Sequence, residues 1–138
     1  MDDLAARLAD RTVSSAFIYT REAHPGENYR HHTTMDDKRA NAKAYQEHSN
    51  VQRPILLDTV DGDCHQAYGI LPNMTWIIGR GGIIIYKGAW TGVEDVEDAF
   101  NAYIDGKERQ IKDQLVPFYS ERFSWRTRNE EGFNEGLV

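Results

Sequence analysis

The sequence has little cysteine and no long apolar run. One of its 138 residues, Cys64, carries a thiol, so neither a disulfide nor a CxxC pair can form within the chain. No stretch reaches the roughly 18 consecutive apolar residues that a membrane-spanning helix needs. The first residues, Met1 to Leu4, lack the basic and apolar regions of a signal peptide. These absences predict a cytoplasmic protein with no membrane partner.

A concentrated basic surface is also lacking. The chain has 16 Lys and Arg against 22 Asp and Glu, and its formal net charge is -6. Its basic residues are spread along the sequence, except for Arg122, Arg126 and Arg128. Binding to nucleic-acid phosphates needs a dense basic patch, so we expect no nucleic-acid partner. The length and the 40% hydrophobic content are typical of one globular domain with one core.

The order of apolar and polar segments predicts an α/β fold. Strands are expected at 14–20, 54–58, 75–78 and 83–86, of which the last two form a hairpin. Helices are expected at 2–10, at about 35–48 behind Thr33 or Thr34 as a cap, in a short segment around Cys64 that Gly69 ends, and behind Thr91, which has capping-box spacing to Glu94. Parallel units followed by a hairpin are typical of a sheet with an antiparallel edge.

The C-terminal segment is expected to differ from the rest of the chain. We predict that residues 1–106 form the domain and that residues 107–138 form a C-terminal helix and an aromatic tail that packs on it. The tail carries the apolar residues Phe118, Tyr119, Phe123, Trp125 and Phe133. This tail, or an open sheet edge, is where we expect a homodimer to form.

Several segments, taken in order, match the motifs of one family. Residues 17–27 contain the turn Glu22-Ala23-His24, and 54–61 contain Leu57-Asp58-Thr59. Ala67-Tyr68-Gly69, Leu71-Pro72 and the strand at 83–88 follow. These segments resemble the EAH turn, the VVDTMD segment, and the AYG, LP and TIxYKG segments of iodothyronine deiodinases and their bacterial deiodinase-like relatives. The similarity runs unbroken from about residue 8 to residue 104.

The resemblance implies a thioredoxin-like mixed sheet with flanking helices and a thiol-dependent reduction. It also implies a cysteine or selenocysteine nucleophile at the start of the first helix, where the helix dipole stabilises the anion. Here that helix is 2–10, so the first, central strand and the nucleophile turn are lacking. We expect them to be encoded upstream of Met1. The alternatives are that the chain closes this gap differently, or that it is an inactive gene fragment.

His24 is the leading catalytic candidate. It follows a predicted buried strand at its carboxyl end, where ligands bind in open α/β sheets. A histidine there can exchange a proton near neutral pH or donate a hydrogen bond to a developing anion. Glu22, two residues earlier, can orient it, and the resemblance to the EAH turn implies both roles. The alternative is that His24 only shapes the loop.

The remaining candidates are expected at the same edge of the sheet. Asp58 and Thr59 follow the second predicted strand and are candidates for substrate binding, although acids there more often form turns and begin helices. Pro72 and Met74 precede the antiparallel strand, in the loop that faces the nucleophile in thioredoxin-like folds. The isomer of the peptide bond before Pro72 is left open.

Cys64 is a further candidate nucleophile, because it is the one thiol and lies in the first turn of a predicted helix. Its spacing to Ala67 and Tyr68 instead predicts a core-facing, structural thiol. We expect no metal or cofactor, since the spacing of His24, His31, His32 and His48 does not favour a metal site.

Three functions therefore compete. The first is a deiodinase-like oxidoreductase that acts on a small-molecule or thiol substrate and uses a thiol cosubstrate. The second is a non-catalytic thioredoxin-like module that binds another protein. The third is a redox or sensor role for Cys64.

Overall fold

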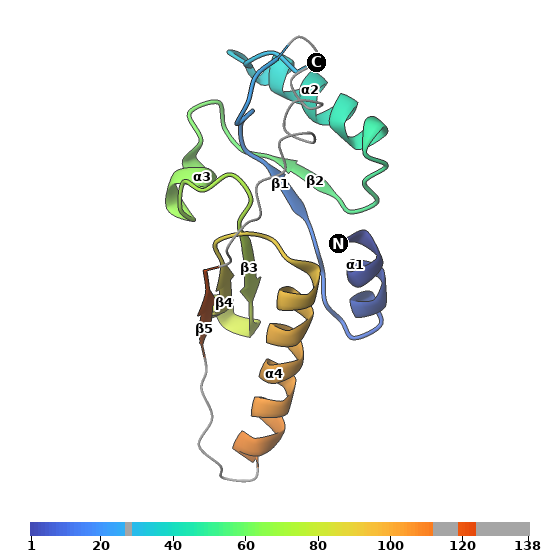
Figure 1. The fold of residues 1–138 in the computed structure, drawn as a ribbon, viewed down its shortest axis with the longest axis vertical. Helices are drawn as coiled ribbons and strands as arrows, with labels where there is room; N and C mark the ends of the chain where they lie inside the picture. Colours follow the sequence, from blue (N-terminus) through green and yellow to red (C-terminus); the bar gives the residue numbers. More distant parts are fainter. Residues whose placement is uncertain (27–28, 112–118, 124–138) are drawn as a thin grey trace. The chain divides into compact units, whose positions relative to one another are not determined.

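The computed structural model describes residues 1–26, 29–111 and 119–123. The chain divides into two compact units at the bond between Pro72 and Asn73 (Figure 1). The first contains Met1–Pro72 and the second contains Asn73–Arg126. Both units mix helix and strand, which confirms the prediction of an α/β protein at that level.

The first unit is built on a parallel pair of strands. Its elements are α1 (Asp2–Ala9), β1 (Phe17–Tyr19), α2 (Met35–His48), β2 (Ile55–Leu57) and α3 (Asp63–Ala67). β1 and β2 pair in register from Phe17 opposite Ile55 to Tyr19 opposite Leu57. The parallel direction requires a crossover, which α2 supplies, as in a βαβ unit.

One face of this strand pair packs on α2. Phe17 stacks on Tyr45 of α2 with ring centroids 5.3 Å apart, and Tyr19 lies 6.3 Å from the same ring. On the other face Ile18 and Leu56, which are register partners, are 42% and 53% exposed. The prediction of a largely buried β1 therefore holds for one face only.

Side-chain hydrogen bonds fix the starts of α2 and α1, and only the one in α2 is a cap. Thr34 begins α2 with a capping box: its hydroxyl accepts a hydrogen bond from the Asp37 backbone N–H, and the Asp37 side chain accepts one from the Thr34 N–H. At the start of α1, Asp2 accepts hydrogen bonds from Arg53 Nε and from the backbone N–H of Gln52. The predicted cap of α2 is thus confirmed, and Asp2 connects α1 to the segment before β2.

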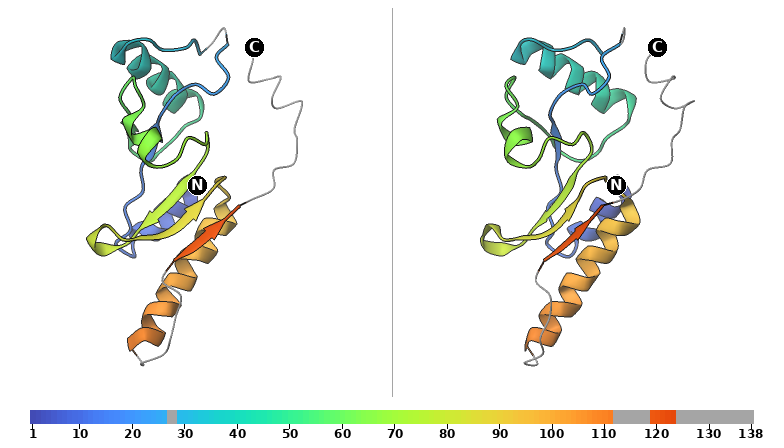
Figure 2. Two further views of the ribbon diagram at one scale, coloured as in Figure 1. Left: turned by 90° about the vertical axis from the view of Figure 1, so that its left-hand side faces the viewer. Right: turned by 60° about the vertical axis from the view of Figure 1, so that its left-hand side comes forward.

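The second unit is a three-stranded sheet with one long helix. Its elements are β3 (Thr75–Ile78), the 3₁₀ turn η1 (Arg80–Gly82), β4 (Ile84–Gly88), α4 (Val93–Ile111) and β5 (Ser120–Arg122). β3 and β4 form the predicted antiparallel hairpin, and β5 adds to the other edge of β4 in parallel. Figure 2 shows α4 running along this sheet, with β5 next to β4. Ile85, Tyr86, Val96 and Phe100 form the buried apolar core.

Thr91 does not cap α4 as its spacing to Glu94 predicts. The helix begins at Val93, after Gly92, and the Val96 N–H donates to the Gly92 carbonyl. The Thr91 hydroxyl is instead 2.5 Å from the Thr75 hydroxyl and donates to the Asn73 carbonyl at 3.0 Å. These hydrogen bonds join the start of β3 to the segment before α4. They also occupy the Thr91 hydroxyl, which a cap of α4 would need.

The described strands form two sheets, of order β1-β2 and β3-β4-β5. The sequence analysis expected 14–20 and 74–78 to belong to one mixed sheet, with the lacking central strand between them. No pairing among the described strands tests that expectation. Residues 107–111 continue α4, Tyr119 and Phe123 are exposed, and the rest of the predicted aromatic tail lies outside the described residues. No helix within the described ranges combines the length and the apolar character that crossing a membrane requires.

The capping box of α2 provides the first test. Replacing Thr34 by Ala removes the acceptor for the Asp37 N–H, and should lower the free energy of unfolding by about 1 kcal/mol. Thr33→Ala is the matched control, because Thr33 contacts the same carboxylate but is not the cap residue. Urea denaturation measures both. Equal losses in the two variants would contradict the assignment of Thr34 as the cap.

Candidate functional site

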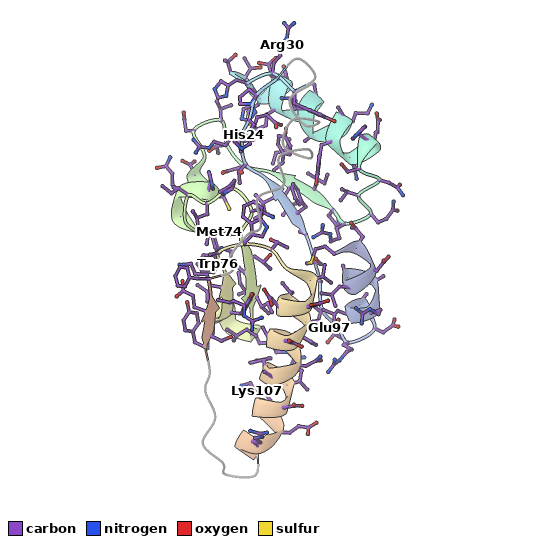
Figure 3. The ribbon with its side chains drawn as sticks, in the orientation of Figure 1. His24, Arg30, Met74, Trp76, Glu97 and Lys107 are labelled. Atoms are coloured by element: carbon purple, nitrogen blue, oxygen red, sulfur yellow. The ribbon has the colours of Figure 1, made fainter. Side chains whose placement is uncertain are left out.

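The ends of β1 and β2 bring most of the predicted site residues into the first unit. Glu22 and His24 follow β1, whereas Asp58 and Thr59 follow β2. The Asp58 N–H donates to the Tyr19 carbonyl at 3.1 Å and so extends the parallel ladder to this edge. Figure 3 labels His24 on the loop that leaves β1. The sequence prediction that these residues leave the same edge of a parallel pair agrees with this topology.

Asp58 is the most highly connected group at this edge. Its side chain is 4% exposed and accepts hydrogen bonds from the backbone N–H groups of Thr59, Cys64 and His65 at 2.8–2.9 Å. Burial alone would raise the pKa of Asp58, but these three donors and the charge of Lys38 outweigh it and lower the pKa below its usual value. An ionised Asp58 therefore fixes the start of α3.

Lys38 is fully buried beside this carboxylate. It lies in the first turns of α2, and its Nζ donates to the Thr59 carbonyl at 2.7 Å. Burial lowers the pKa of Lys38, and the charge of Asp58 opposes that change. A buried charge of either sign is costly unless it is paired. Lys38 and Asp58 therefore stabilise each other where α2, β2 and α3 meet.

Two other polar side chains of this unit are buried and, unlike Asp58 and Lys38, each has a polar atom with no hydrogen-bond partner among the described residues. Tyr19 and His32 are 6% and 2% exposed, and their rings lie 6.3 Å apart. Within the part of the chain that the structure describes, neither the Tyr19 hydroxyl nor His32 Nδ1 has a hydrogen-bond partner. Such groups are rare in native structures, because each costs about 1–3 kcal/mol. The described fold therefore leaves two polar atoms of the first unit without a hydrogen bond.

The charge state of His32 follows from its surroundings. Burial lowers the pKa of His32, and the nearby charges of Lys38 and His31 lower it further, whereas Asp37 opposes them. The imidazole is therefore neutral at neutral pH. A neutral imidazole carries one proton and one lone pair, so it can both accept and donate a proton.

The pKa of Glu22 is shifted in the opposite direction from that of His32. It is partly buried, and burial raises the pKa of its carboxyl group. A carboxyl group whose pKa is raised by burial holds its proton more tightly than an exposed one. His24, two residues later, is exposed. The two members of the predicted EAH turn thus lie in different environments.

Cys64 does not have the properties of an activated thiol. It is partly buried in α3, and burial together with the negative charge of Asp58 raises its pKa above 9.0. A raised pKa reduces the thiolate fraction at neutral pH, and the thiolate is the reactive form. Ala67 and Tyr68, which were predicted to lie with Cys64 on a core face, are exposed. That prediction was wrong because α3 is only five residues long and Asp58, rather than an apolar face, fixes its position.

The other predicted binding residues are divided between the units. Thr59 and Pro72 belong to the first unit, whereas Met74 lies near the start of the second and is labelled in Figure 3. The described residues contain no cis peptide bond, so the bond before Pro72 is trans. The Thr59 hydroxyl accepts a hydrogen bond from the Asp63 N–H at 3.1 Å. A substrate-binding role for these residues stays a prediction.

Potential metal ligands are not grouped. Across residues 1–26, 29–111 and 119–123, no three His, Cys, Asp or Glu side chains lie close enough to hold a metal ion. His31 and His32 stack with ring centroids 5.6 Å apart rather than converging on one point.

Comparison with family models, with curated proteins and with solved structures gave no match. The resemblance to the deiodinase family is therefore a prediction from the motifs, and the chemistry of this edge must be argued from its own residues.

The sequence analysis missed Tyr19, His32 and Lys38 as site residues. Tyr19 could have been found, because it alternates with Phe17 on the face of β1 that α2 covers. His32 was considered only as a metal ligand. No pattern marks the burial of Lys38, since lysines in a polar helix are almost always exposed.

The environment of Cys64 gives the second test. We expect iodoacetamide to label Cys64 more slowly in the native chain than in urea, because both burial and Asp58 disfavour the thiolate. Asp58→Asn removes the charge and should raise the native rate, whereas Asp61→Asn, at an exposed acid, should not. Circular dichroism checks that both variants are folded. Equal labelling rates in two folded variants would contradict the influence of Asp58.

The pKa of His32 gives the third test. Since its folded pKa lies below the ordinary value of 6.5, the unfolded chain binds a proton more tightly. The stabilising effect of the neutral ring is complete above pH 6.5 and is lost as the pH falls below it. His32→Gln should flatten this fall in the free energy of unfolding between pH 7 and pH 5. His48→Gln, at an exposed histidine that ends α2, is the control and should keep the wild-type slope.

Proposed function

We propose that this chain supplies the proton-transfer part of a thioredoxin-like oxidoreductase that performs a thiol-dependent reduction. The observation that carries the proposal is the pair of buried groups without partners, the Tyr19 hydroxyl and His32 Nδ1, in the unit that carries Glu22 and Asp58 at its strand ends. Perturbed titratable groups and unsatisfied buried polar atoms concentrate at functional sites.

A thiol-dependent reduction needs side chains that can give and accept protons. Reduction of a substrate by two thiols forms a disulfide and transfers two protons, one of which must reach the leaving group. Glu22, with its raised pKa, suits the acid that gives this proton, and neutral His32 suits its transfer or replacement. His24 follows on the same loop and is suited to donate a hydrogen bond to the developing anion.

The sheet of the first unit supports the thioredoxin-like part of the proposal. Among the described strands, β1 pairs only with β2, so its other edge is open. The face with Ile18 and Leu56 is exposed, whereas parallel sheets are normally covered on both faces. A further parallel strand beside β1, carrying the nucleophile at its end, would satisfy the open edge.

A second candidate is a protein-binding module without catalytic activity. It is favoured by the chemistry of Cys64, the one thiol of the sequence, whose pKa is raised. In that case no activated nucleophile is used, and the partner binds an exposed apolar face.

Tyr19→Phe separates a functional from a structural role of the buried hydroxyl. Removing an unpaired buried hydroxyl should leave the chain at least as stable as wild type, with a gain of up to about 1 kcal/mol in urea denaturation. In a turnover assay, the same change should lower the rate about a hundredfold, which is the lower end of what one proton-transfer group contributes. Turnover is followed by disulfide formation from dithiothreitol with peroxide or an iodinated phenol as the substrate.

His48→Gln is the control for turnover, because it changes an exposed histidine at the end of α2. Loss of stability in Tyr19→Phe with normal turnover would overturn the proton-transfer role. Normal turnover in a stable Tyr19→Phe chain would favour the binding module.

A further inference from the structure

The segment between β2 and β3 presents apolar side chains to solvent (Figure 1). Residues 60–71, which contain α3 and are called the α3 loop below, expose four large apolar side chains: Val60 at 38%, Tyr68 at 38%, Leu71 at 45% and Ile70 at 68%. Single exposed apolar residues are normal on a protein surface, whereas a group of them marks an interaction site.

Hydrogen bonds fix the α3 loop in the conformation that exposes these side chains. The Asp58 carboxylate accepts the His65 backbone N–H at 2.9 Å, and His65 Nε2 lies 3.2 Å from the Leu71 carbonyl oxygen. Gln66 Nε2 donates to the Asp61 carbonyl at 2.8 Å. The apolar side chains are therefore presented by a preformed loop, which lowers the conformational entropy that a partner must remove on binding.

The exposed charge of the α3 loop is negative. Asp61 and Asp63 are exposed, and the sequence has no Lys or Arg in residues 54–79. Lys38 donates to the Thr59 carbonyl at the start of the loop, but it is buried and does not present its ammonium group to a partner. An acidic surface attracts a partner of opposite charge and repels one of like charge. The ligand that fits this loop is therefore cationic and carries apolar side chains.

From this combination we propose that the α3 loop is a docking surface for a cationic segment of another protein. The apolar side chains of that segment cover Val60, Ile70 and Leu71, and its Lys or Arg side chains lie against Asp61 and Asp63. The apolar contacts supply affinity, and the charges supply specificity and a faster association. This surface goes beyond the proposed reduction, because it uses none of the side chains assigned to proton transfer.

The charge separates this partner from other occupants. Nucleic acids and anionic membranes carry the same sign of charge as Asp61 and Asp63 and are repelled. A symmetric dimer that pairs the loop with itself places like charges opposite each other, which is unfavourable. A cationic, apolar polypeptide meets neither obstacle.

Fluorescence anisotropy tests the surface with defined peptides. The probe is a fluorescein-labelled amphipathic peptide of leucine and lysine, and the reference peptide has glutamate in place of lysine. The lysine peptide should bind the wild-type chain, and Ile70→Ser should weaken its affinity about tenfold, because this variant removes the most exposed apolar side chain of the loop. Ile83→Ser, at a 59% exposed isoleucine of the second unit, is the matched control and should keep the wild-type affinity. Equal affinities of these two variants, each verified as folded by circular dichroism, or equally tight binding of the glutamate peptide would overturn the proposal.

Charge neutralisation gives a second test with the same lysine peptide. Asp61→Asn with Asp63→Asn should weaken binding and reduce its dependence on NaCl concentration, whereas Glu94→Gln with Asp98→Asn, at exposed acids of α4, should change neither. The two pairs remove the same charge, so the comparison separates a local site from attraction to the net charge of -6. Equal effects of the two pairs, or no binding of the lysine peptide to the wild-type chain, would contradict the proposed surface.

Discussion

The ionised side chain of Asp58 is the group on which the arrangement of the first unit depends. It accepts three backbone N–H groups, from Thr59, Cys64 and His65, and so sets where α3 begins. Its charge also offsets the burial of Lys38, which connects α2 to the end of β2. Buried ion pairs contribute little net stability, but removing one partner is costly. Asp58 therefore determines geometry more than stability, and it does so next to the groups proposed to move protons.

The same constraint bears on the thiol of Cys64, whose pKa is raised. A helix start normally favours a thiolate, but here the backbone N–H groups at the start of α3 are already occupied by the Asp58 carboxylate. The negative charge that holds the helix in place also raises the pKa of the neighbouring thiol. One interaction thus fixes the fold of this edge and raises the pKa of the one thiol on it.

Local patterns predicted the elements well and their surroundings less well. The Thr34 cap and the hairpin of β3 and β4 follow from short-range chemistry, so the sequence was sufficient for them. Thr91 failed as a cap because its hydroxyl has partners from a distant segment. The site was predicted in part: Glu22 and Asp58 follow from strand ends, but the burial of Lys38 depends on the packing of α2 over β2, which no spacing in the sequence encodes.

The complete burial of Lys38 also has a consequence for chemical labelling. Acylating reagents reach a lysine amine only through solvent, and this amine has no exposed surface and donates to the Thr59 carbonyl. In the folded chain it escapes a reagent that modifies surface lysines, and it becomes reactive only when α2 leaves the end of β2. Modification at this one position therefore records how often the first unit opens, without any substrate, spectroscopic probe or added tag.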